Sequence, residues 1–106
     1  MNATTFAALG EPNRLRIVEL LRSEPLAVGE IAESLDIRQP QVSKHLRVLR
    51  DTGLVTAEYV ARRRVHHLQS EPFEDIASWV DSFERLWELR LDGLADHLAQ
   101  RKENRP

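Results

Sequence analysis

Two short amphipathic helices, separated by only three residues, are predicted in the middle of this chain, and they constrain its fold most strongly. The first spans residues 28–35, where apolar side chains recur at i, i+3, i+4 and i+7. The second spans residues 39–52 and stops before Gly53, a residue that favours the left-handed conformation found at helix ends. Residues 36–38 leave room only for a tight turn, so this segment is predicted to form a helix-turn-helix.

A β-hairpin is predicted directly after this motif. β-branched and aromatic residues indicate a strand over residues 54–60, and residues 65–68 are its expected partner. Residues 61–64 then form the tip, and no turn type is assigned because the tip contains neither Gly nor Asn. A helix-turn-helix followed by a hairpin is a winged helix. The predicted fold class is therefore mainly α with a small β-hairpin.

Further helices are predicted on both sides of this unit. Residues 4–9 are predicted to form a short amphipathic turn or helix, and a longer helix begins at Pro12 and ends near Ser23. After residue 70 the chain predicts one long helix over residues 72–100, with Ser70 as its N-cap.

This last helix is apolar on more than one side. One seam of apolar side chains repeats at steps of three or four residues: Ile76, Val80, Phe83, Trp87, Leu91, Leu94 and Leu98. Three further apolar side chains lie beside this seam: Trp79, Leu86 and Leu89. A chain of 106 residues has little core to cover both sides. We therefore expect the helix to pair with the same helix of a second copy in a homodimer. The alternative is that both tryptophans pack in the core of their own protomer. Residues 1–106 would form a single domain whose terminal helices build the dimer interface: Phe6, Leu9, Trp79, Val80, Phe83, Trp87 and Leu91.

Charge is strongly segregated along the chain, although the net charge is only −2. Residues 37–68 carry seven basic and two acidic side chains, a local charge of +5, whereas residues 1–36 and 69–106 carry −3 and −4. A basic middle between acidic flanks predicts a surface for a polyanion. The alternative is an ordinary solvated face.

The ordered set of motifs resembles the ArsR/SmtB-type winged-helix transcriptional repressors. The runs that carry the resemblance are Ala8–Ile17, Val28–Ala32, Gln39–Leu46, Gly53–Val55 and Arg63–Val65. The closing helix is similar to a branch of that family without a metal site, on account of Trp79, Phe83, Trp87 and Arg90–Asp92. The resemblance implies a homodimer that binds palindromic DNA and represses transcription, including that of its own gene. Arg38 and Ala27 stand where the family usually has a capping Ser or Thr.

The exposed side of the second helix of the motif is predicted to read DNA. Glutamine amides suit adenine and the arginine fork suits guanine, while Lys and Ser suit phosphates or base edges. The arginines of the hairpin suit a flanking minor groove and its phosphates, and the alternative is a solubility device. The predicted DNA-binding residues are Arg38, Gln39, Gln41, Ser43, Lys44, Arg47, Arg62, Arg63 and Arg64.

We expect no metal site, no cofactor and no catalysis. The chain has no cysteine, and His97 and Asp96 are adjacent on a helix, where they point about 100° apart and cannot chelate together. Ser43 and His45 face different ways, so they form no nucleophile–base pair. His45 is expected to be a structural histidine. Two alternatives stay open: a winged-helix module that binds protein, and a repressor of the same fold that responds to a metal or another inducer.

The expected location is the cytoplasm, without a membrane partner. No apolar run approaches the roughly 18 residues of a membrane span. The first ten residues lack the basic-then-apolar form of a signal peptide.

Overall fold

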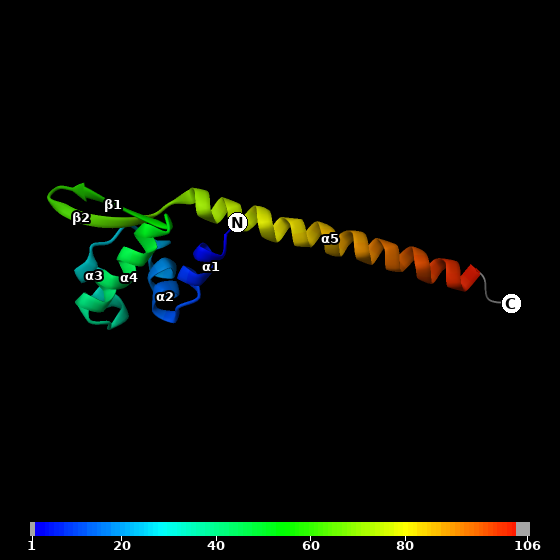
Figure 1. The fold of residues 1–106 in the computed structure, drawn as a ribbon, viewed down its shortest axis with the longest axis horizontal. Helices are drawn as coiled ribbons and strands as arrows, with labels where there is room; N and C mark the ends of the chain where they lie inside the picture. The colour runs from blue at the N-terminus through cyan, green and yellow to red at the C-terminus, as the bar shows by residue number, and fades with distance from the viewer. Residues whose placement is uncertain (1, 104–106) are drawn as a thin grey trace. The chain divides into compact units, whose positions relative to one another are not determined.

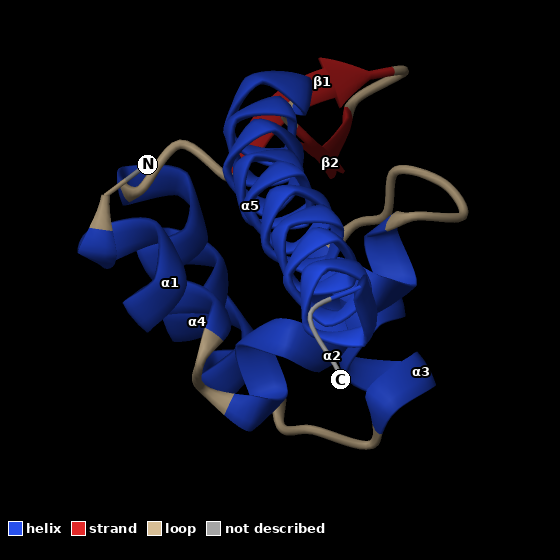
Figure 2. Cartoon of the chain, turned by 90° about the vertical axis from the view of Figure 1, so that its right-hand side faces the viewer, coloured by secondary structure: helices blue, strands red, loops and turns tan. Residues whose placement is uncertain are grey.

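The computed structural model describes residues 2–103, and the side chains of residues 2–100. The elements follow in the order α1 (Ala3–Leu9), α2 (Pro12–Leu21), α3 (Val28–Leu35), α4 (Gln39–Asp51), β1 (Val55–Val60), β2 (Arg63–Leu68) and α5 (Ser70–Glu103) (Figure 1). The two strands form an antiparallel hairpin, which is drawn red in Figure 2, where the helices are blue. The predicted fold class is confirmed. The chain divides into a winged-helix unit that ends at Glu74 and a helical unit that begins at Asp75.

The core of the winged-helix unit is built from α2, α3, α4 and the start of the hairpin. Its largest fully buried side chains are Ile17, Ile31, Val42, Leu46, Leu49 and Leu54. Three of them form the predicted apolar stripe of α4, and each contributes about 1.5–3 kcal/mol by leaving water. Burial of this stripe fixes the rotation of α4 about its axis and leaves the opposite side of the helix exposed.

The turn between α3 and α4 is as short as predicted. Asp36 adopts the left-handed conformation (φ 54°) after α3, and the Ile37 N–H donates to the Ala32 carbonyl at 3.1 Å. Arg38 is extended and serves as the N-cap of α4, but no side chain caps the helix. The helix nevertheless begins at Gln39, because its packing, rather than a capping hydroxyl, determines where it starts.

The hairpin differs from its prediction at the tip. Only Ala61 and Arg62 connect the strands, both with positive φ (49° and 69°), and Val60 already pairs with Arg63. Positive φ at both central residues matches the twist of the flanking strands, so the ladder extends two residues further than the sequence indicates. The four-residue tip was therefore wrong: Arg63 and Arg64 belong to β2.

Smaller differences concern helix ends. The first helix begins at Ala3, because the Asn2 side chain caps it by accepting from the Thr5 N–H at 3.0 Å. The second ends at Leu21 rather than near Ser23, since the following N–H groups bond three residues back in a tighter turn. The last helix includes Ser70, which therefore does not act as its N-cap.

The helical unit consists of the part of α5 from Asp75 onward. Within this unit neither tryptophan is buried: Trp79 is 42% exposed and Trp87 is 60% exposed. The Trp79 and Phe83 rings pack edge-to-face with centroids 4.8 Å apart, and Arg85 pairs with Asp81 at 2.9 Å. None of the helices in the described part of the chain has the length and apolar character needed to cross a membrane.

Candidate nucleic-acid interface

The exposed side of α4 carries the polar residues that were predicted to read DNA. Because the apolar stripe faces the core, the helix positions predicted to read DNA point outward, and all five are exposed: Gln39, Gln41, Ser43, Lys44 and Arg47. Arg38, just before the helix, is exposed as well. The structure therefore brings these six residues to one end and one side of a single helix. Amide, hydroxyl and cationic groups on such a helix are the donors and acceptors that base edges and phosphates require.

A carboxylate at the start of α2 reaches α4 from the side. Glu11 Oε2 accepts the Arg14 N–H at 2.8 Å as the cap of α2, and the same oxygen lies 3.7 Å from Nδ1 of half-buried His45. This contact joins two helices of the core and leaves the exposed side of α4 untouched. It supports the interpretation of His45 as a structural residue.

The three arginines predicted at the wing tip occupy different environments. Arg62 lies in the turn, Arg63 forms an ion pair with Glu30 of α3, and Arg64 pairs across the hairpin with Tyr59. The predicted cluster is therefore divided between the turn, which holds Arg62, and β2, where Arg63 but not Arg64 pairs with α3.

Glu30 connects the wing to the start of α3. Its Oε1 accepts the Ala27 N–H at 3.0 Å and also pairs with Arg63. Although Ala27 lacks a hydroxyl, half of the capping box is present, because the glutamate still satisfies the N-cap backbone. The same oxygen thus stabilises a helix end and holds one wing arginine.

The base of the wing is fixed by a backbone bridge. The His66 N–H donates to the Leu26 carbonyl at 2.8 Å, and the Leu26 N–H donates to the His66 carbonyl at 3.1 Å. Leu26 precedes α3, so the bridge ties β2 to the helix-turn-helix. The wing is therefore held against the motif by main-chain bonds and not by side chains alone.

The His66 side chain is buried (3% exposed) and contacts α4, since Arg50 Nη1 lies 3.1 Å from its Nε2. A guanidinium only donates, so Nε2 accepts and the neutral ring carries its proton on Nδ1. Burial, followed by the positive charges of Arg50 and Arg64, lowers the pKa of His66 below its ordinary value of 6.5. Its neighbour His67 is half-buried, 3.8 Å from Glu58. Of the two histidines, the inward-facing one is His66.

Two residues near this surface were not predicted from the sequence. Arg50 lies on the last turn of α4, where the sequence gives no sign that it meets the wing. The sequence predicts Tyr59 only as a residue of the first strand, yet 76% of it is exposed opposite Arg64. Strand alternation would have placed Tyr59 on the face shared with Arg64, had the register of the hairpin been known.

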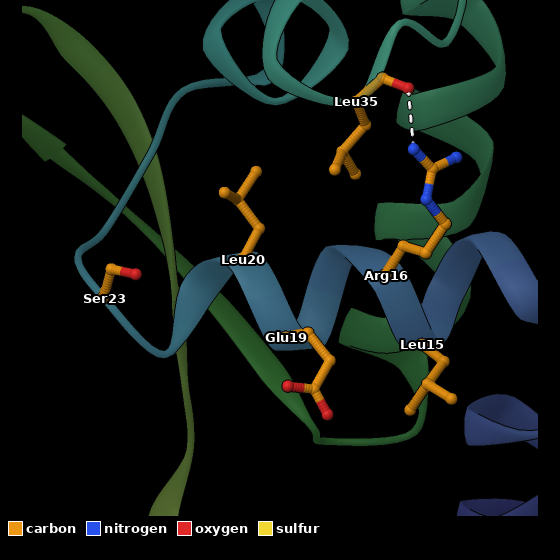
Figure 3. A pocket seen from close by; sticks show the side chains of 6 residues that line it. All are labelled: Leu15, Arg16, Glu19, Leu20, Ser23 and Leu35. Atoms are coloured by element: carbon orange, nitrogen blue, oxygen red, sulfur yellow. Dashed lines mark hydrogen bonds between the residues drawn. The ribbon is translucent and has the colours of Figure 1, made fainter.

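A hollow with a volume of about 470 Å³ lies between α2 and α3. Leucines from both helices point toward this space, and one arginine at its edge donates to a backbone carbonyl of α3 (Figure 3). That bond joins Arg16 Nη2 to the Leu35 oxygen at 2.9 Å. The polar groups of this hollow do not converge on one point. Across the residues that the structure describes, no three His, Cys, Asp or Glu side chains gather as a metal site would require.

Comparison with known proteins gives a consistent result. Residues 11–57 match the family described as "Bacterial regulatory protein, arsR family". The HTH-type transcriptional regulator Rv2034 of Mycobacterium tuberculosis is 39% identical over 90 residues, which cover 85% of this chain and 81% of the relative. The transcriptional repressor SdpR of Bacillus subtilis is 27% identical over 78 residues, covering 74% of this chain and 87% of the relative.

Solved structures share the same architecture. The homodimeric winged helix-turn-helix DNA-binding domain Mb0332 from Mycobacterium bovis, a possible ArsR-family regulator, is 26% identical with a TM-score of 0.64. The similarity covers 78% of this chain and 77% of that one. Rv2034 and SdpR are named as transcriptional regulators, a class of protein that is not enzymatic. With 39% identity to Rv2034 over most of its length, the chain belongs to the ArsR family of bacterial transcriptional regulators.

Proposed function

We propose that the protein is a homodimeric repressor that binds a palindromic operator in duplex DNA through α4 and the wing. One observation carries this proposal: the buried stripe of Val42, Leu46 and Leu49 turns the polar side of α4 outward in the most basic part of the chain. The name of SdpR as a repressor and that of Mb0332 as a homodimeric DNA-binding domain support it.

Each group on α4 has a role in this proposal. Gln39 and Gln41 offer amides that suit adenine, and Arg47 offers a fork that suits guanine. Ser43 and Lys44 contact phosphates or base edges, next to Arg38 at the start of the helix. The wing arginines reach the flanking minor groove or its phosphates, with Arg63 first released from Glu30.

The dimer is proposed to form through the terminal helices, within a single functional domain. The exposed apolar side chains of α5 supply most of its surface: Trp79, Val80, Phe83, Trp87 and Leu91. Phe6 of α1 is also exposed, whereas Leu9 already packs partly against the core of its own protomer and adds less. Two recognition helices would then enter successive major grooves about 34 Å apart.

Repression would follow from blocking polymerase access, at the protein's own promoter among others, in the cytoplasm. We propose no cofactor and name no inducer. No described feature favours the metal-responsive or protein-binding alternatives over DNA binding.

Selection from a pool of random duplexes tests this function. The expected result is enrichment of an imperfect palindrome whose half-sites lie one helical turn apart, with affinity that falls steeply as salt rises. A mobility shift on the region upstream of the gene separates autorepression from regulation elsewhere. A failure to enrich any duplex would contradict DNA binding and leave the protein-binding alternative.

A further inference from the structure

A small hollow separates α4 from the wing, on the side of the hairpin that carries His66. It has a volume of about 110 Å³, well above the roughly 10–15 Å³ that one water needs, and its lining residues are Val28, Ser43, Leu46, Arg50, Arg64 and His66. Two of these are apolar, and the other four bear polar groups. None of the lining side chains is a carboxylate.

The polar groups of this hollow are mainly hydrogen-bond donors. Arg50 and Arg64 can only donate, and within the described part of the chain neither pairs with an acidic side chain. Because Nε2 of His66 accepts from Arg50, its Nδ1 carries a proton, and this buried nitrogen has no partner in the described structure. The Ser43 hydroxyl can donate too. Donors and positive charges without an acceptor favour an anionic oxygen ligand.

We propose that this hollow seats a phosphate group, and that its source is one phosphate of the DNA backbone gripped jointly by Arg50 and Arg64. The inference deepens the function proposed above and rests on it. Ser43 belongs to the exposed side of α4 and Arg64 to β2, so a phosphate here would be held between the groove-reading helix and the wing. Such a contact fixes the register of a protein on its duplex without reading sequence.

The division among the wing arginines agrees with this assignment. Arg63 is paired with Glu30, whereas Arg64 lies on the hairpin face that His66 shares. Arg50 does not belong to the exposed side of α4 that was predicted to read DNA, and a phosphate in the hollow gives this arginine a role in binding. Its contact with His66 positions the guanidinium at the edge of the hollow.

The salt dependence of binding reports how many phosphates the protein neutralises, so it tests the proposed phosphate site directly. When log affinity is plotted against log salt concentration, the line falls with a slope of about 0.9 for each phosphate neutralised. We expect Arg64→Gln and Arg50→Gln each to weaken binding to the selected operator roughly tenfold, as loss of a hydrogen bond to a charged group does. Because both arginines hold the same phosphate, the double variant should lower the slope by about 0.9 and not by twice that amount.

Controls separate this role from a structural one. Arg22→Gln removes an exposed arginine that pairs with Glu19 on α2, and it should leave the slope unchanged. In the Arg64→Gln background, Arg50→Lys keeps one positive charge at the hollow and should restore most of the slope that Arg50→Gln removes. Thermal unfolding of each variant shows whether it is folded, and Arg64→Gln, at an exposed position, tests the seat even if Arg50→Gln unfolds.

Each outcome has one reading. A fall of about 1.8 in the double variant, or no fall in any variant, would overturn the shared seat. A second experiment measures the melting temperature in inorganic phosphate, with chloride at equal ionic strength as the control. Suppose phosphate raises the melting temperature of the wild type but not of the double variant, while the two proteins show equal salt slopes for DNA binding. The hollow then binds a free oxyanion and not a DNA phosphate, and the inference fails. If the wild type binds no duplex at all, the proposed function itself fails.

Discussion

At the scale of single residues, His66 shows what a sequence can and cannot predict. Alternation along a strand indicates that one of His66 and His67 faces inward. Which one does so depends on the bridge between β2 and Leu26, a contact between residues far apart in the sequence. The contact of His66 with Arg50 depends on the same bridge, and for that reason no local pattern indicates it.

The lowered pKa of His66 predicts a loss of stability in acid. The unfolded chain protonates this group near pH 6.5 and the folded protein only at lower pH, so between the folded-state pKa and pH 6.5 the unfolded state binds more protons. The free energy of unfolding should be highest above that pH and fall as pH drops from it toward the folded-state pKa. His66→Gln should flatten this part of the profile in urea titrations. An unchanged profile in His66→Gln would contradict the prediction.

The polar side of α4 predicts two different defects in DNA binding. Lys44→Ala should weaken binding to operator and random duplexes alike, because a charge on phosphate carries no sequence information. Gln41→Ala should mainly reduce preference for the operator, by about 1–3 kcal/mol if its amide reads an adenine. Fluorescence anisotropy with both duplexes measures the difference. If neither variant alters binding, α4 does not enter the groove.

At the scale of elements, the helices were predicted more accurately than the wing. Apolar periodicity and the residues Pro12 and Gly53 placed α2, α3 and α4 to within two residues. The turn of the hairpin had no such signal, because Ala61 and Arg62 adopt positive φ without being Gly or Asn. Helix periodicity is local, whereas the hairpin turn is imposed by pairing of the strands on either side of it.

The wing turn predicts a stabilising substitution. Ala61 has φ 49°, a conformation that costs a residue with a Cβ about 1–2 kcal/mol, so Ala61→Gly should raise the free energy of unfolding by up to about 1 kcal/mol. Ala57→Gly, in the middle of β1, is the matched control and should lower it by about 0.5–1 kcal/mol. Urea unfolding measures both. A loss of stability in both variants would show that the turn is not strained.

At the scale of the whole molecule, the sequence predicted that α5 would be apolar on more than one side, and the exposed rings of the helical unit agree. In our proposal, a second copy of the chain covers these exposed rings. Trp87→Glu places a charge within the seam, so it should dissociate the dimer and weaken operator binding together. Glu88→Gln, at the next position, is the control and should change neither property in sedimentation and anisotropy measurements. A dimer that survives Trp87→Glu would place the interface elsewhere.

The most direct test is the mass of the complex on a selected operator duplex, measured by sedimentation equilibrium over a range of protein concentrations. We expect a dimer in the absence of DNA, and two protomers on each duplex at saturation with no stable complex of one. A protein that stays monomeric at all concentrations, or that saturates the duplex as a single protomer, would contradict the paired recognition helices.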